Sequence, residues 1–333
     1  MTSSLGQMLE TIPAPPQAQG PQPVRYHVRP IPEAPAHYFG KTSAGLPCLL
    51  LTSHDSAAKA PVRLTAIEVS FAVPCRIAIP GEPERTEILT AVSCTSPDAE
   101  IQRYFAHVCE TILRIIGAQP SLRAIIDAVA RLVDLFQKLS RPSKRPVTGL
   151  FGELLVIHLS ASPAAAVQAW RSTVDERFDF SAGDLRLEVK ASSTRQRAHS
   201  FSLEQCTPPA GTAGVLISLF VESSGGGLSL LELMQRIESQ LGAEPDLIMK
   251  LQETVADALG ASAAGALPMR FDEKLARTSL QVYELAAVPA IRAGIPTEVS
   301  QVRFRSDLSR TPPASLGSLS GQCEFARLLL PAR

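Results

Sequence analysis

The sequence has no CxxC pair, and no histidine stands at zinc-finger spacing from any of its cysteines. Six scattered cysteines in 333 residues are too sparse for the disulfide framework of a small secreted protein. The missing pairs also remove the signature of a structural zinc site. We therefore expect six reduced, mostly buried thiols, which are Cys48, Cys75, Cys94, Cys109, Cys206 and Cys323.

Secretion and membrane signals are also missing. The N-terminus has no basic start followed by an apolar segment, so it is not typical of a signal peptide. The most conspicuous apolar run, residues 214–221, is far shorter than the ~20 residues of a membrane span. The formal net charge is zero, so any surface that attracts nucleic acid must be local. These absences predict a cytoplasmic protein with no membrane partner.

Several familiar catalytic fingerprints are absent as well. The sequence contains no P-loop, no dinucleotide-binding GxGxxG and no GxSxG nucleophile elbow. Gly225, Gly226 and Gly227 are followed by no Lys-Ser or Lys-Thr pair, so they predict a flexible turn rather than a phosphate-binding loop. An ATP-driven motor would have to be a separate subunit.

Proline density and hydrophobic periodicity divide the chain into four predicted parts. Residues 1–35 hold eight of the 27 prolines and predict a flexible lead-in. Residues 36–145 combine short apolar runs, typical of strands, with two helices, the first capped at Ser96. Residues 146–245 predict a helix, a strand pair, a short helix, a strand and a helix. Residues 246–333 are expected to form a C-terminal α/β extension, so the fold class is mixed α/β (α+β).

The predicted strand over residues 185–190 alternates without interruption between apolar and charged side chains. Successive side chains of a strand point to opposite faces, so Arg186, Glu188 and Lys190 share one face. Such a pattern also suits a solvated hairpin with cross-strand charge pairs, and Glu-x-Lys is common. On the strand alone, that alternative stays open.

The preceding predicted strand, residues 177–180, carries Asp179 between two phenylalanines. If residues 181–184 form a four-residue hairpin loop, Asp179 falls on the face of Glu188 and Lys190, and any even loop length preserves this placement. Asp179 and Glu188 would then be diagonal neighbours roughly 7–8 Å apart. Two carboxylates at that separation can converge on one divalent cation.

A helix predicted over residues 149–160 adds a third carboxylate. Glu153 lies on an otherwise apolar stripe, so it faces the core and needs a compensating partner such as a cation. Gly149 and Gly152 lower helix propensity, but they would let a sheet or a phosphodiester backbone approach closely. A buried ion pair between Glu153 and a nearby arginine is an equally good explanation. The single tryptophan, Trp170, is interpreted as packing.

A polar run follows Lys190, and it contains Ser192, Arg195 and Arg197. Residues 138–199 hold ten Lys or Arg against six Asp or Glu, a balance of +4 within a neutral chain. This local excess favours a phosphate-binding face, although such a run is more often a solvated loop.

Three ordered motifs resemble those of the PD-(D/E)XK nuclease superfamily. They are Gly149-Leu-Phe-Gly-Glu153 on the helix, Phe178-Asp179-Phe180 on one strand and Glu188-Val-Lys190 on the next. The chain specifically resembles an uncharacterised bacterial group of PD-(D/E)XK proteins, over most of residues 36–310. One departure is that Phe178 takes the place of the proline before the aspartate.

The resemblance implies a restriction-endonuclease-like core, a mixed sheet flanked by helices, beside a β-rich N-terminal unit. It implies a Mg²⁺-dependent deoxyribonuclease (Mn²⁺ as an alternative metal) in restriction or antiphage defence, working with other defence subunits. Asp179 and Glu188 would bind the metal, with Glu153 and the Val189 carbonyl assisting and Lys190 as the catalytic amine. DNA would be held by the residues Ser192, Arg195, Arg197 and Gln205.

Two alternatives remain at this point. The same fold could bind nucleic acid or a defence partner without cleaving, or it could cleave RNA. Neither composition nor motif spacing separates them.

Overall fold

The structure, a computed structural model, describes residues 5–13, 25–53, 59–171, 177–292, 294–321 and 323–331. The chain divides into two compact units. The first contains residues 1–143 and 259–265, and the second contains residues 144–258 and 266–333. The predicted C-terminal extension therefore falls within the second unit rather than forming a part of its own.

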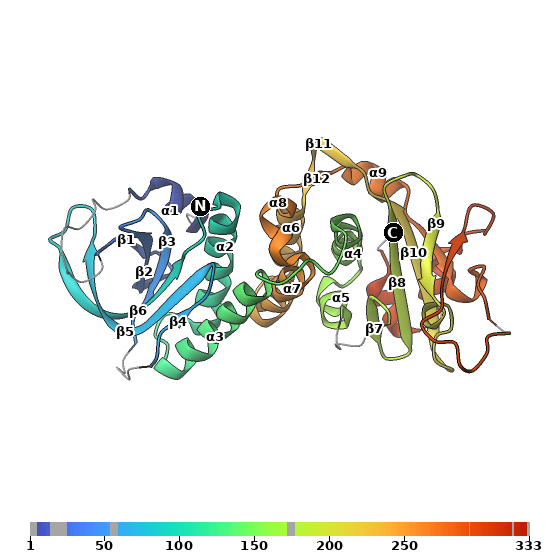
Figure 1. The fold of residues 1–333 in the computed structure, drawn as a ribbon, viewed down its shortest axis with the longest axis horizontal. Coiled ribbons are helices and arrows are strands. Elements are labelled where there is room, and N and C mark those ends of the chain that lie inside the picture. Colours follow the sequence, from blue (N-terminus) through green and yellow to red (C-terminus); the bar gives the residue numbers. More distant parts are fainter. Residues whose placement is uncertain are drawn as a thin grey trace. The chain divides into compact units, whose positions relative to one another are not determined.

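The first unit is built on a closed sheet (Figure 1). Its strands follow the order β1-β2-β3-β6-β5-β4, and β1 also pairs in parallel with β5, which closes the ring. The strands are β1 (Arg25–Ile31), β2 (Ala34–Thr42), β3 (Pro47–Leu51), β4 (Val62–Arg63), β5 (Ile67–Ala78) and β6 (Arg85–Cys94).

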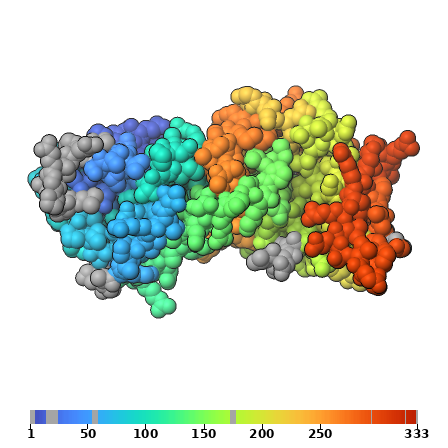
Figure 2. Space-filling model, in the orientation of Figure 1, coloured from blue at the N-terminus to red at the C-terminus, as the bar shows by residue number. Residues whose placement is uncertain are grey.

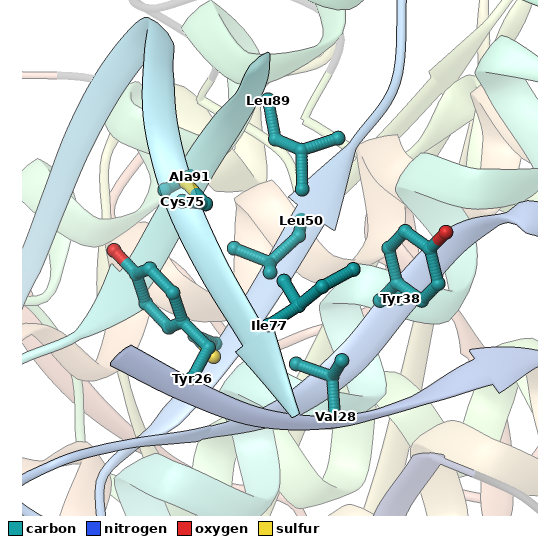
Figure 3. Close-up of a cluster of buried hydrophobic side chains, with 9 residues drawn as sticks. Tyr26, Val28, Tyr38, Leu50, Cys75, Ile77, Leu89 and Ala91 are labelled. Carbon is teal, nitrogen blue, oxygen red and sulfur yellow. The ribbon is translucent and has the colours of Figure 1, made fainter. Parts of the chain in front are cut away.

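The interior of this closed sheet is apolar. Figure 3 shows side chains from several strands meeting there, among them Val28, Leu50 and Ile77, each at most 1% exposed. Alternate residues of β1 and β5 are buried, as expected for strands with one face on a core. The other members of the cluster are Tyr26, Tyr38, Cys48, Cys75, Leu89 and Ala91.

Three helices accompany this sheet: α1 (Leu5–Thr11), α2 (Ala99–Ile116) and α3 (Leu122–Lys138). The Ser121 hydroxyl caps α3 by accepting from the Ala124 N–H. The cap predicted at Ser96 is wrong, because the Asp98 carboxylate accepts from the N–H groups of Glu100 and Ile101 and so begins α2.

Of the flexible or extended lead-in predicted over residues 1–35, the structure describes residues 5–13 and 25–35, and these form regular structure. Helix α1 packs against α2 and β2, and β1 lies inside the closed sheet. Pro30 is tolerated because the β1–β2 register shifts between Pro30 and Ile31, where a missing N–H breaks no regular ladder.

The second unit contains a mixed four-stranded sheet of order β13-β10-β8-β7 (Figure 1). Strand β8 pairs in parallel with β10 and antiparallel with β7, and β10 pairs antiparallel with β13. The fold is thus the mixed α/β class predicted for a PD-(D/E)XK core. The strands are β7 (Phe180–Ala182), β8 (Leu185–Ser192), β10 (Ala213–Phe220) and β13 (Gln281–Glu284).

Two smaller ribbons flank this sheet. Strand β9 (Ala198–Ser202) pairs with β14 (Arg303–Asp307), and Figure 2 shows the C-terminal segment, in red, against the yellow-green residues that precede it in this unit. Strand β11 (Ser223–Ser229) pairs with β12 (Arg270–Phe271). The predicted flexible turn at Gly225 to Gly227 lies within the bounds of β11, in the irregular stretch between its paired residues Ser223 and Leu228. A side chain at Gly227 would collide with the Phe271 backbone.

Helix α4 (Val147–Leu159) contacts β8, α5 and α6, and so positions the segment that carries Glu153. The remaining helices are α5 (Pro163–Ala169), α6 (Leu230–Leu241), α7 (Pro245–Leu259), α8 (Ala263–Ala266), α9 (Glu273–Thr278), α10 (Leu316–Ser320) and α11 (Glu324–Leu329). Single 3₁₀ turns are η1 (Glu204–Cys206), η2 (Gly260–Ser262) and η3 (Leu285–Ala287). Among the described residues, none of the helices combines the length and the apolar character needed to cross a bilayer.

Candidate active site

The two faces of β8 have different neighbours. A β-carbon on Gly152 of α4 would lie 3.1 Å from the Ala191 β-carbon, so α4 packs on the face that carries Ala191. Gly152 thus allows the close approach of the sheet, one of the two uses expected for it. Because side chains alternate along a strand, Glu188 and Lys190 point to the other face, which β9 and η1 cover.

Asp179 lies at the edge of β8, just before β7 begins. Phe180 pairs with Leu187, so the hairpin turn has two residues rather than the four predicted. The loop length is still even, and Asp179 Oδ2 accepts a hydrogen bond from the Val189 N–H at 2.8 Å. The strand predicted over residues 177–180 begins at Phe180 instead, so Asp179 reaches the site from the strand edge.

Glu188 is a buried carboxylate with one unsatisfied oxygen. The residue is 3% exposed. Its Oε1 accepts from Lys190 Nζ and from Gln205 Nε2, both at 2.6 Å. Its Oε2 is buried and has no hydrogen-bond partner among the described residues. Leaving a buried acceptor unsatisfied costs roughly 1–3 kcal/mol, so this oxygen is suited to bind a cation that is not part of the chain.

Gln205 links Glu188 to Lys190. Its Nε2 also donates to the Arg177 carbonyl at 3.2 Å, and its Oε1 accepts from the Ser202 N–H at 3.1 Å. Its Oε1 also lies 3.4 Å from Lys190 Nζ, which sits 5.2 Å from the centre of the Phe201 ring. The short helix predicted near residues 201–205 is replaced by the end of β9 and the turn η1, and this turn aims Gln205 at the acid.

Glu153 forms a buried ion pair with an arginine, the alternative that the sequence left open. Arg171 Nη2 lies 2.8 Å from both carboxylate oxygens of Glu153, and the Trp170 indole N–H donates to Oε2 at 2.8 Å. Arg171 Nη2 also donates to Asp179 Oδ1. Arg145 Nη1 stands farther away, 3.4 Å from Glu153 Oε1 and 3.5 Å from Asp179 Oδ1.

Sequence reasoning missed both Trp170 and Arg171. Trp170 was interpreted as packing, and it is indeed fully buried, but its N–H has a carboxylate partner. Arg171 follows it with a φ of 46°, in the left-handed region, and its N–H donates to the Asp179 carbonyl at 3.1 Å. A buried tryptophan needs a partner for its N–H, which is the one signal that could have pointed to this pair.

Burial raises the pKa of both glutamates at this site. Burial, together with the neighbouring Asp179 carboxylate, raises the pKa of Glu188 to about 8, against the opposing effect of Lys190. Burial and Asp179 likewise raise the pKa of Glu153 to about 7, although Arg171 and Arg145 oppose the shift. Carboxylates that resist ionisation in this way gain strongly from an added cation.

The three acids do not form a single metal-binding cluster. Within the described part of the chain, no group of three or more His, Cys, Asp or Glu side chains is arranged to hold a metal ion. Glu153 approaches from the α4 side of β8, and Arg171 and Trp170 occupy its oxygens. The prediction that Glu153 joins Asp179 and Glu188 around one cation stays a prediction, because in this structure the Glu153 oxygens are bonded to Arg171 and Trp170. The free Glu188 oxygen beside Asp179 still fits a divalent cation.

The residues predicted to bind nucleic acid are dispersed. The exposed Arg195 side chain pairs with the half-buried Glu222 at 2.6 Å, and Ser192 Oγ contacts Thr194. Arg197 donates to the Ser218 carbonyl at 2.8 Å and to the Ser279 carbonyl, so it is built into the sheet. Gln205 alone joins the acids.

A buried histidine stands on the lysine-bearing face. His199 Nε2 lies 2.8 Å from the Ser218 hydroxyl, which also accepts from Arg197. Burial lowers the pKa of His199 to about 4, with help from the positive charges of Lys190, Arg197 and Arg305. His199 is therefore neutral at physiological pH.

Comparison with known proteins gives one match. A family model described as "Putative PD-(D/E)XK family member, (DUF4420)" matches residues 9–309, which span most of both units. No curated protein and no solved structure matches. PD-(D/E)XK proteins are nuclease-like, and such nucleases typically use divalent metals. Since the model covers far more than half of the sequence, this chain belongs to that PD-(D/E)XK family.

Proposed function

We propose that this chain is a divalent-metal-dependent nuclease whose centre consists of Asp179, Glu188 and Lys190. The observation that carries the proposal is the buried Glu188 carboxylate, which has Lys190 on one oxygen and, among the described residues, no partner on the other. A second acid at the strand edge completes the set of residues that the motif requires.

Asp179 and Glu188 would hold Mg²⁺ or Mn²⁺, with the Val189 carbonyl as a further oxygen ligand. When bound, the metal supplies charge neutralisation at the scissile phosphate and lowers the pKa of a bound water. The Val189 N–H fixes Asp179 Oδ2 at 2.8 Å, so the chain holds this carboxylate at a defined position beside β8.

Lys190 is the group that the chain itself brings to the reaction. Its ammonium is held between Glu188 and Gln205 with the Phe201 ring nearby, so its position is fixed and partly shielded from water. A fixed ammonium at this place stabilises the negative charge that develops on a phosphate oxygen. Gln205 is a positioning residue, because its amide holds Glu188 and Lys190 together.

DNA is the proposed substrate, in a restriction or antiphage defence system with other subunits. The +4 balance over residues 138–199 supports a polyanionic substrate. Arg195 would have to leave Glu222 to reach a phosphate, which is feasible because their pairing is exposed to solvent. The choice of DNA and of a defence role follows from the family resemblance.

The direct test is the nicking of supercoiled plasmid with Mg²⁺, with Mn²⁺ and with EDTA. We expect metal-dependent nicking by the natural chain and a loss of about 10³-fold in the variant Glu188→Gln. Arg186→Ala is the matched control, because it removes a charge from the same face of the same strand. The Arg186 guanidinium donates to the Gly183 and Leu185 carbonyls and, among the described residues, forms no hydrogen bond with the acids. Metal-dependent nicking that persists in Glu188→Gln would contradict the proposal.

A second candidate is a nuclease-fold subunit that binds without cleaving. The observation that favours it is Arg171, whose guanidinium already compensates both Glu153 and Asp179. Binding of labelled DNA and RNA of the same sequence, measured beside cleavage, separates the candidates. Binding with no cleavage under any divalent metal supports the scaffold, whereas cleavage of RNA alone identifies a ribonuclease.

A further inference from the structure

The guanidinium of Arg171 occupies the space between two carboxylates that come from different elements. We infer that Arg171 is an internal counter-cation of the metal-free site, and that a divalent cation binding at Asp179 must displace it from that carboxylate. The inference rests on the proposed function, because it takes Asp179 to be a metal ligand.

The contacts of Arg171 support this inference directly. Its Nη2 donates to Asp179 Oδ1 and lies 2.8 Å from both Glu153 oxygens, while Nε lies 3.1 Å from Oε2. Both acids are at most 5% exposed, and the arginine side chain is 15% exposed. Water therefore screens these charges weakly, and the pair needs a cation in place at all times.

A second cation at Asp179 would compete with the guanidinium. The Arg171 guanidinium carries a positive charge, because arginine is not deprotonated in proteins. A divalent ion on the same carboxylate would meet this fixed positive charge at close range and in poorly screened surroundings. Metal affinity is therefore reduced for as long as Arg171 remains on Asp179.

The backbone of Arg171 keeps the counter-cation in place. Its φ of 46° lies in the left-handed region, which residues other than glycine rarely adopt. The Arg171 N–H donates to the Asp179 carbonyl, and Trp170 forms an isolated bridge with Phe180. The same two segments are thus joined through backbone and side chain, which restricts where the guanidinium can move.

The neighbouring residue provides a readout that does not depend on catalysis. Trp170 is the only tryptophan of the chain, and its N–H is bonded to the same Glu153 that pairs with Arg171. A change in the charge around Glu153 changes the field at the indole ring. Intrinsic tryptophan emission therefore reports on the state of this cluster alone.

The test is a titration of metal-stripped protein with MnCl₂ and with MgCl₂, followed by Trp170 emission. We expect Arg171→Ala to bind either metal ten- to a hundred-fold more tightly than the natural chain, a coupling of ordinary size. Arg236→Ala is the control, since Arg236 pairs with Glu273 at 3.0 Å in an exposed position of the same unit. Its metal affinity should equal that of the natural chain.

Thermal unfolding gives an independent measurement. In EDTA, Arg171→Ala should melt below the natural chain because two buried acids lose their nearest cation, while Arg145 stays 3.4 Å from Glu153 and 3.5 Å from Asp179. MnCl₂ at one fixed high concentration should raise its melting temperature by more than that of the natural chain, since at equal concentration a more tightly bound ligand stabilises the folded state more. A purely structural role predicts the same loss of melting temperature with and without metal.

If Arg171→Ala does not fold, Arg171→Lys carries the test. Lysine keeps the charge but lacks the planar fork, so it should bind metal about three-fold more tightly than arginine does. Equal metal affinity of the natural chain and the soluble variant overturns the inference. Since this result leaves plasmid nicking unaffected, it is distinct from failure of the proposed function, in which no protein binds metal or nicks DNA.

Discussion

The two sides of β8 each contain a buried glutamate, and the two carboxylates are compensated in different ways. On the arginine side, formed by Glu153, Trp170 and Arg171, both carboxylate oxygens have partners from the chain. On the lysine side, formed by Glu188, Lys190 and Gln205, one carboxylate oxygen has partners and the other has none among the described residues. Asp179 stands between the two sides at the strand edge.

The difference indicates which side is built for stability and which for binding. A carboxylate whose oxygens are all occupied has its burial compensated within the fold, whereas an unsatisfied oxygen remains costly until a ligand arrives. Function is expected to concentrate where the fold leaves such a cost in place. We therefore propose that the chemistry belongs to the lysine side and that the arginine side supports Asp179.

The largest expected effect is on cleavage. Lys190→Ala should lower the nicking rate about 10³-fold, because it removes the fixed charge beside the reacting phosphate. Lys190→Arg should restore little, since a planar guanidinium cannot take the place of a compact ammonium. If Lys190→Ala lost its cleavage activity because it unfolded, as seen from a large drop in melting temperature, the lysine side would instead be a structural ion pair.

The arginine side should respond in stability. Glu153→Ala removes the partner of Arg171 and Trp170, and we expect the free energy of unfolding to fall by about 3 kcal/mol. Urea unfolding followed by circular dichroism measures the change, and Glu153→Gln, which keeps an acceptor for the Trp170 N–H, should lose less. If Glu153→Ala and the natural chain had the same urea midpoint of unfolding, the arginine side would not be the stabilising one, and the distinction between the two sides would fail.

The lysine side could be predicted from the sequence because its logic is local. Alternation along residues 185–190 places Glu188 and Lys190 on one face whatever surrounds the strand. The placement of Asp179 depended only on an even turn length, and the two-residue turn meets that condition although its length differs from the prediction.

The arginine side could not be predicted because its logic is tertiary. Glu153 and Arg171 are 18 residues apart, and helix α5 lies between them in the sequence. Hydrophobic periodicity predicts single elements, so it could not predict that these two residues meet. Strand β1 was missed for a related reason. Pro30 and the prolines on either side of the strand obscured an alternating pattern, which forms a strand by pairing with β2 and β5.

The pH dependence of the free energy of unfolding can separate the contribution of His199, which lies near Lys190, from the contributions of the buried acids. His199 titrates near 6.5 when unfolded and at about 4 when folded, so the unfolded state binds more protons between these values. Its contribution to stability is complete above pH 6.5 and is lost as the pH falls towards 4, by about 3 kcal/mol. His199→Gln should therefore unfold with a shallower loss of stability between pH 6.5 and 4, measured in urea by Trp170 emission. The acids with raised pKa and the buried His37 occur in both proteins, so their effects cancel in the difference, and parallel pH profiles would contradict the prediction.

The smallest effect is expected at the exposed counterpart of the buried ion pair. Arg195 resembles Arg171 in having a positive φ, 51°, and in contacting both oxygens of a glutamate, Glu222, at 2.6 and 2.9 Å. It differs in that its side chain is 64% exposed, so water competes with the pairing and screens it. Arg195→Ala should leave the urea midpoint unchanged within error, whereas Arg171→Ala should lower it clearly. If the two variants lost the same stability, burial would not be what distinguishes the arginine side. The difference between the two sides of β8 would then rest on the unsatisfied Glu188 oxygen.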